Sequence, residues 1–182
     1  MKHHEFDIPA LFVRRNSIYK SLTSEAYDDT RDARTYTGTS AIVAHPPCRA
    51  WGKYQHKSKH TAEERALAIW ALHHIQRHGG VLEHPRTSTL WHEQSLPQPG
   101  TRDEFNGITV PLLQSWYGMK APKMTYLYIV GLTRAQLPQF PMELGTPLGR
   151  VENMSHAQRE RTPPMLARYL LILAQQIEEN KK

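Results

Sequence analysis

The sequence predicts a single-domain α/β protein with a mostly parallel sheet and flanking helices. The main observation is a strand–helix–strand pattern in residues 41–85, in which each apolar run stops at a polar loop that contains proline. A helix that joins two parallel strands places both of these loops at the same edge of the sheet. An alternating run at 123–130 and an amphipathic stretch at 165–178 supply a further strand and a closing helix.

The first elements follow from short apolar runs and their end signals. Residues 10–13 are apolar and predict a strand, and 16–22 predict a short helix with Asn16 or Ser17 as its N-cap. Residues 41–44 predict a buried strand that ends before Pro46-Pro47, because neither proline offers an N–H to a sheet.

The central helix is predicted from its two ends. Thr61 with Glu64 three residues later forms a capping-box pattern, and Gly79-Gly80 is a stop signal. The apolar residues between these signals cover a broad face, as expected of a helix packed on a sheet.

The second half of the chain is interpreted in the same way. Thr162 is the expected N-cap of the final helix, with prolines in its first turn. The remaining expected elements are a strand at 80–82 broken at Glu83, a helical turn at 88–93, a short helix at 111–118 ending at a Gly118 C-cap, the strand at 123–130 and an extended loop at 138–147.

Composition limits the class of protein. The 182 residues carry a formal charge of +6 and 11 histidines, which is compatible with nucleic acid or nucleotide partners and equally with an ordinary basic soluble protein. No apolar run approaches the roughly 20 residues that span a bilayer, so we expect a cytoplasmic protein without a membrane partner. One cysteine excludes an internal disulfide. Residues 1–9 and 179–182 are expected to be flexible ends.

Cys48 and Glu83 are the candidate catalytic residues. Each follows a predicted strand, so we expect both to face one pocket at the carboxyl edge of the sheet, where open α/β sheets bind ligands. His45 and Arg49 are expected to favour the Cys48 thiolate by their charge. The alternatives are a small buried cysteine and an acid that serves only a turn.

Several other residues have the chemistry to bind a nucleotide. Arg14, Asn16 and Ser17 at a helix start could hold an anion, although a capped surface helix explains them as well. Asp28 or Asp29 could accept a hydrogen bond from a ribose hydroxyl, although a solvated charge cluster is the more common interpretation. Trp51 and Tyr54 lie in a basic stretch, where aromatic faces could stack on bases.

Two histidines raise the question of a metal. His74 and His78 lie one helical turn apart, but no acid or further ligand is spaced with them. We therefore expect no metal.

The motifs His45-Pro46-Pro47-Cys48, Leu82-Glu83-His84-Pro85 and Gln114-Ser115-Trp116-Tyr117-Gly118, followed by Lys123-Met124-Thr125, resemble those of phage and prophage proteins related to the DNA cytosine-5 methyltransferases. The resemblance covers residues 41–131 and implies a compact Rossmann-like, methyltransferase-like domain. It implies a pyrimidine-base-modifying enzyme acting on DNA or a nucleotide.

The resemblance also implies roles for individual residues. The Cys48 thiolate would attack C6 of a flipped-out cytosine, and Glu83 would bind N3 and the exocyclic amine. The residues expected to line the pocket around the base are Pro47, Trp51, Tyr54, His84, Gln114 and Lys123.

The family binds S-adenosylmethionine through a glycine-rich loop after the first strand, and here that position reads Arg14-Arg15-Asn16-Ser17-Ile18. Arg14, Asn16, Ser17 and Asp28 would have to hold the cofactor instead. Two alternatives remain open. One is a non-catalytic phage protein of an anti-defence type that binds nucleic acid or nucleotides, and the other is a base-releasing enzyme that uses Glu83 as general acid or base.

Overall fold

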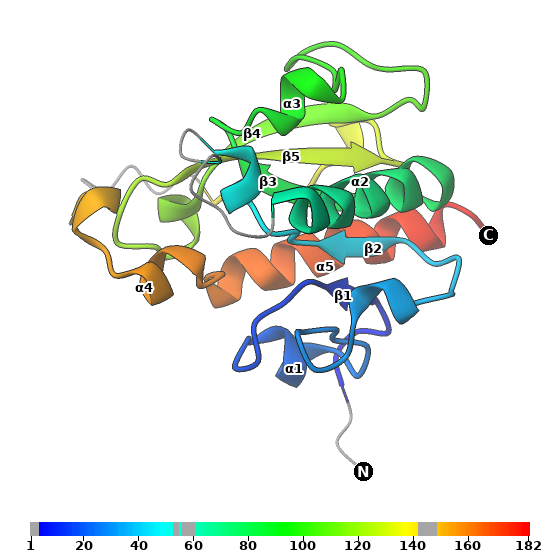
Figure 1. Cartoon of the computed structure of the whole chain (residues 1–182). Helices are drawn as coiled ribbons and strands as arrows, with labels where there is room; N and C mark the ends of the chain where they lie inside the picture. The colour runs from blue at the N-terminus through cyan, green and yellow to red at the C-terminus, as the bar shows by residue number, and fades with distance from the viewer. Residues whose placement is uncertain (1–3, 53–54, 56–60, 142–148) are drawn as a thin grey trace.

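The computed structural model describes residues 4–52, 55, 61–141 and 149–182, which build a five-stranded mixed sheet (Figure 1). The strand order is β1 (Ala10–Leu11), β2 (Ile42–Ala44), β3 (Gly80–Pro85), β5 (Met124–Val130) and β4 (Ile108–Leu113). β1, β2 and β3 are parallel, whereas β5 runs antiparallel to both β3 and β4. The α/β class and the strand–helix–strand unit are confirmed, but the expectation of a mostly parallel sheet is wrong.

The antiparallel half of the sheet follows from a short connection. β4 and β5 are joined by only residues 114–123, which is too short for the crossover that a parallel pair requires. The prediction of a helix at 111–118 is therefore wrong for residues 111–113, which belong to β4. Pro111 is tolerated there because β4 is an edge strand. The remainder forms the 3-10 turn η4 (Gln114–Tyr117), with Gly118 as its C-cap at φ 92° as the sequence predicts.

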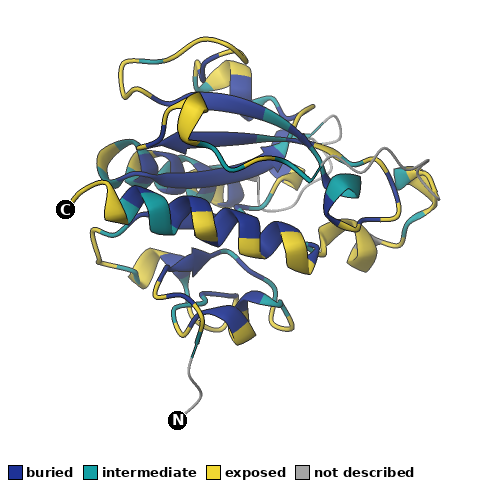
Figure 2. Ribbon diagram, turned by 180° about the vertical axis from the view of Figure 1, so that it is seen from behind, coloured by how far each residue is buried: buried dark blue, intermediate teal, exposed yellow. Residues whose placement is uncertain are grey.

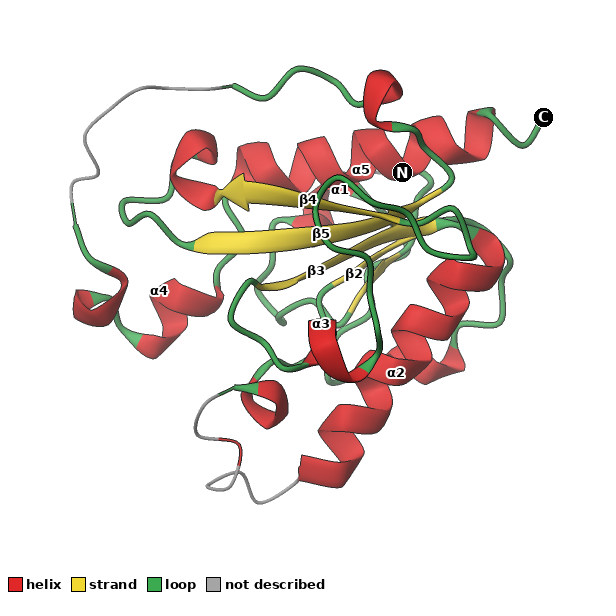
Figure 3. Ribbon diagram, turned by 90° about the horizontal axis from the view of Figure 1, so that it is seen from above, coloured by secondary structure: helices red, strands yellow, loops and turns green. Residues whose placement is uncertain are grey.

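One long helix covers each face of the sheet (Figure 3). α2 (Thr61–His78) packs on one face, where the buried residues include Leu72, Leu82 and Tyr128. α5 (Pro164–Glu179) packs on the other face, where its buried side chains form one core with Val81 and Ile129 of the sheet. Figure 2 shows α5 turning its buried residues to the sheet and its exposed ones outward. Neighbouring strand residues thus point to opposite cores, as the pleat dictates.

The helix ends differ from the expected ones in detail. The N-cap of α5 is Pro163 with Pro164 at N1, so Thr162 is not the cap. The capping-box pattern predicts that the Glu64 side chain turns back to the start of α2. Its carboxylate forms an ion pair with Arg49. The short helices are α1 (Tyr19–Leu22), whose N-cap residue Ile18 makes no side-chain cap, α3 (Leu90–Glu93) and α4 (His156–Glu160).

The stop after α2 is confirmed and has a steric reason. Gly80 adopts φ 138°, and a Cβ built on it would lie 2.5 Å from the carbonyl oxygen of Ile42. Only glycine lets β3 approach β2 this closely.

The chain's beginning is more ordered than expected where it is described. Phe6 and Ile8 are buried in the core on the α5 side, and Phe6 bridges to Thr23. Residues 142–148 of the predicted extended loop lie outside the described residues. None of the described helices combines the length and apolar composition needed to cross a membrane.

Candidate active site around a buried carboxylate

Glu83 lies inside the sheet, one residue beyond the strand end that the sequence indicates. β3 continues to Pro85, and Glu83 pairs with Leu127 of β5. Its side chain therefore points to the α5 face of the sheet and is only 8% exposed. An acid in this position needs polar partners, because burial of an unpaired carboxylate is costly.

Three side chains from separate elements meet this carboxylate. The amide of Gln114 donates to Glu83 Oε1 at 3.0 Å, and the hydroxyl of Thr125 contacts the same oxygen. His45 Nδ1 lies 3.1 Å from Oε2. Since a carboxylate offers about four acceptor positions, the described contacts leave one position on Oε2 open.

The charge state of Glu83 follows from these contacts. Burial alone would raise the pKa of Glu83, but the hydrogen bond from His45, the positive charge of Lys123 and the hydrogen bond from Thr125 outweigh it. The net pKa lies well below the usual value for glutamate. Glu83 is therefore a buried anion at neutral pH.

A tyrosine that the sequence does not single out completes the cluster. Tyr19 of α1 is fully buried, and its hydroxyl lies 2.8 Å from Nε2 of His45. Burial, and then the charge of Glu83, raise the pKa of Tyr19 well above its usual value, so it keeps its proton. The sequence carries no signal for this contact, because it depends on how a four-residue helix docks beneath the sheet edge.

Cys48 lies at the start of the turn η2 (Arg49–Trp51), just after β2. The residue as a whole is exposed, although its thiol is partly buried. This burial is the largest effect that raises the thiol pKa, and the negative charge of Glu83 is the next. The positive charge of Lys123 lowers the thiol pKa. The pKa of the thiol is thus raised overall, although the charges of Arg49 and Cys48 attract each other. Arg49 also forms an ion pair with the buried carboxylate of Glu64.

The structure does not gather all the expected pocket residues beside Glu83. Gln114 contacts the carboxylate, and Lys123 acts on it by charge while its ammonium group donates to the carbonyl of Arg159 at 3.0 Å. Pro47 is half-buried in the loop that precedes Cys48. Tyr54 lies outside the described residues.

Trp51 and His84 are core residues, which corrects two expectations. Trp51 is fully buried on the α2 side, and the guanidinium of Arg65 lies 3.8 Å from its ring centroid, so neither face is open to a base. His84 is also fully buried, and the backbone of Pro47 is the polar group that acts on its ring at close range. Burial lowers the pKa of His84 to about 4, so the ring is neutral at physiological pH.

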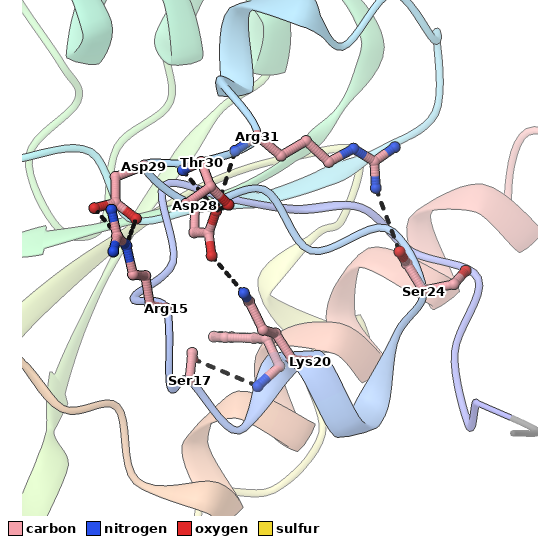
Figure 4. A network of polar contacts seen from close by, with 9 residues as sticks. Arg15, Ser17, Lys20, Ser24, Asp28, Asp29, Thr30 and Arg31 are labelled. Carbon is pink, nitrogen blue, oxygen red and sulfur yellow. Dashed lines mark hydrogen bonds and ion pairs between the residues drawn. The ribbon is translucent and has the colours of Figure 1, made fainter.

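Asp28 does not fit the role of ribose acceptor. Its carboxylate accepts hydrogen bonds from Lys20, from the backbone and hydroxyl of Thr30 at 2.8 and 2.6 Å, and from the backbone of Arg31 at 3.1 Å (Figure 4). The hydrogen bond from Lys20 is the largest of the effects that lower the pKa of Asp28. Asp28 is only 6% exposed and is tied to its own loop and to Lys20, so its carboxylate is not presented to a ligand.

The other residues expected to hold S-adenosylmethionine fit no better. Arg14 donates to the carbonyl of Ala157 and pairs with Glu160 of α4. Asn16 is exposed in a turn, and the Ser17 hydroxyl lies 3.5 Å from the backbone nitrogen of Tyr19. These side chains are engaged with the protein or turned to solvent, so they form no cradle for the cofactor.

The two histidines of α2 interact with each other and with the backbone. The ring centroids of His74 and His78 are 4.8 Å apart, and His74 Nε2 lies 3.1 Å from the carbonyl oxygen of Ser40. The described residues contain no group of three potential ligands that could hold a metal ion.

Comparison of the chain with protein-family models, with curated proteins and with solved structures finds no match. The fold and the site together define an α/β protein with a thiol beyond the carboxyl end of β2 and an anionic carboxylate inside the adjacent parallel strand β3.

Proposed function

We propose that the protein modifies a pyrimidine base in a nucleic acid or nucleotide, with Cys48 as nucleophile and Glu83 as the base-binding group. The observation that carries the proposal is the placement of these two residues on neighbouring strands. Cys48 follows β2, Glu83 is the first residue of β3 beyond its pairing with β2, and the charge of Glu83 acts directly on the thiol.

The contacts of Glu83 suit a base that donates one N–H. Its one open acceptor position can receive a single N–H, and the exocyclic amine of cytosine offers such a donor. Uracil also has a donor on this edge, its N3–H, so the comparison of cytosine with uracil belongs to the assay below. A site built to accept a hydrogen bond discriminates strongly against a ligand that lacks any donor.

The chemistry assigned to Cys48 needs no metal or cofactor for its first step. The thiol loses its proton to water, and Sγ bonds to C6 while the C5–C6 π pair moves to C5. C5 then takes a proton from water, loses its original hydrogen, and the Sγ–C6 bond breaks. The net result is exchange of the C5 hydrogen with solvent.

Substrate binding and thiol activation are coupled in this proposal. The negative charge of Glu83 raises the thiol pKa. An N–H of the bound base that donates to Glu83 partly neutralises this charge, so the thiol pKa falls. The ammonium of Lys123 acts on both groups and favours the anionic adduct. Binding of a base thus increases the reactivity of Cys48.

Exposed basic side chains support a phosphate-bearing substrate. Arg86, Lys120, Arg159 and Arg161 are exposed, and among the described residues none of them pairs with a carboxylate. Arg86 follows β3 directly, and Arg159 is tied to Lys123 through its carbonyl. Such unpaired charge attracts phosphate groups.

The test is release of tritium to water from oligonucleotides and nucleotides labelled at C5 of cytosine or uracil. We expect release from cytosine that is abolished in Cys48→Ala and strongly reduced in Glu83→Gln, with Arg34→Gln as a surface control. Release that persists in Cys48→Ala, or its absence from every cytosine substrate, would overturn the proposal.

A second candidate is base release with Glu83 as the reacting carboxylate. The observation that favours it is the charge state of the site, because Glu83 is anionic while Cys48 is held as a thiol. Free base in the same reactions, unaffected by Cys48→Ala and abolished by Glu83→Gln, would identify this activity. Intact glycosidic bonds in all substrates would remove it.

A further inference from the structure

We propose that Tyr19 is a positioning residue that fixes the tautomer of His45 and thereby holds Glu83 ready to bind the base. The proposal rests on the function proposed above, because it assumes that Glu83 is the base-binding group. It is carried by a continuous line of contacts from α1 through the loop after β2 to β3.

The tautomer follows from counting donors and acceptors. An anionic Glu83 can only accept, so the contact at 3.1 Å requires a hydrogen on Nδ1 of His45. When the ring carries one hydrogen, Nε2 is an acceptor and the Tyr19 hydroxyl donates to it at 2.8 Å. When the ring carries both hydrogens, Nε2–H donates to the Tyr19 oxygen instead, and the hydrogen of the buried hydroxyl has no acceptor among the described residues. Because a buried hydroxyl hydrogen without an acceptor is costly, Tyr19 favours the ring with hydrogen on Nδ1 alone.

The groups that face this line come from four places. Glu83 lies on one side of the imidazole and Tyr19 on the other. The positive charge of Lys123 lowers the pKa of Glu83, and the negative charge of Glu83 raises the pKa of the Cys48 thiol. The Tyr19 hydroxyl bonds Nε2 directly, so it sets the state of that nitrogen.

The cluster at Asp28 explains how so short a helix can hold Tyr19 in place. The residue after Tyr19 is Lys20, whose ammonium group bonds the buried carboxylate of Asp28 (Figure 4). Asp28 is fixed in turn by Thr30 and Arg31. Adjacent residues of α1 therefore point to different anchors, Tyr19 to the site and Lys20 to the loop. Asp28, which the sequence suggests as a ribose acceptor, acts here as a support for Tyr19.

The experiment measures the ring nitrogens of His45 by ¹⁵N NMR, together with the C5 exchange rate against pH. In the wild type we expect the Nδ1–H tautomer. Tyr19→Phe should give a mixture of tautomers, lower the exchange rate about tenfold by weakening a hydrogen bond to a charged group, and move the acid limb of the profile to higher pH. Asp28→Asn should change the same signals in the same direction to a smaller extent.

Tyr169→Phe is the matched control, because Tyr169 is also buried but its hydroxyl donates to the carbonyl of Pro138 and its ring contacts Tyr117 and Phe140. A wild-type His45 with hydrogen on Nε2, whether or not Nδ1 also carries one, or a Tyr19→Phe spectrum identical to the wild type, would overturn the proposal. Absence of exchange in the wild type would remove the proposed function, whereas the NMR result would still decide the role of Tyr19.

Discussion

Replacing Thr125 with valine tests how much the hydrogen bonds to Glu83 contribute to stability. Thr125 is fully buried, and its hydroxyl is shared between the Glu83 carboxylate and the carbonyl of His84. Valine keeps the shape and removes the hydrogen bond to a charged group, which is worth about 2 kcal/mol. For a chain of this size we expect the melting temperature to fall by about 4–8 °C.

Thr109 provides the matched control on the neighbouring strand. It is 2% exposed, and within the described part of the chain its hydroxyl has no hydrogen-bond partner. Thr109→Val removes a buried polar atom without breaking a bond, so it should leave stability unchanged or raise it slightly. Both variants have the same side-chain change, so their difference isolates the contact with Glu83.

The difference between the two variants should depend on pH. Because the pKa of folded Glu83 lies below that of an unfolded glutamate, its contribution is fully present above about pH 4.5 and is lost as the pH falls. Urea unfolding at pH 7 and pH 3 measures this. Equal stability of Thr125→Val and Thr109→Val at pH 7, or a difference that grows toward pH 3, would refute the reasoning.

Two further pairs of variants test the fold and the Cys48 loop. Gly80→Ala should cost more than about 3 kcal/mol or prevent folding, because its Cβ would meet the backbone of β2, whereas Gly100→Ala, with nothing within 4 Å, should cost only the left-handed backbone, about 1–2 kcal/mol. Circular dichroism and urea unfolding measure both, and similar costs would contradict the close approach of β3 to β2. Arg49→Gln should lose about 1 kcal/mol because it leaves the buried carboxylate of Glu64 without its partner, whereas Arg34→Gln breaks an exposed pair and should lose less than about 0.5 kcal/mol. A larger loss for Arg34→Gln in the same assay would contradict this explanation.

The sequence predicts the strand–helix–strand unit because its signals are local. Pro46-Pro47 and Gly79-Gly80 end their elements by their own backbone restrictions, and the structure confirms both ends. The antiparallel half is not predictable in this way, because a proline at the start of 111–118 suits a helix and an edge strand equally. Only the pairing with β5 decides between them.

The candidate site shows the same division. The proximity of Cys48 and Glu83 follows from parallel strands and could be predicted. The contacts of Tyr19 and Thr125 could not, because they depend on the docking of α1 and on the register of an antiparallel strand. The prediction for Trp51 is wrong because an aromatic residue in a basic stretch has the same local pattern whether it faces solvent or the core.

The most direct test of the shared site is the alkylation rate of Cys48 as a function of pH in the wild type and in Glu83→Gln. Cys48 is the only cysteine in the chain, so iodoacetamide labelling followed by mass spectrometry reports this thiol alone. Because the negative charge of Glu83 raises the thiol pKa, neutralising it should move the midpoint of the alkylation profile to lower pH. A midpoint that does not move would contradict the claim that Cys48 and Glu83 act in one site.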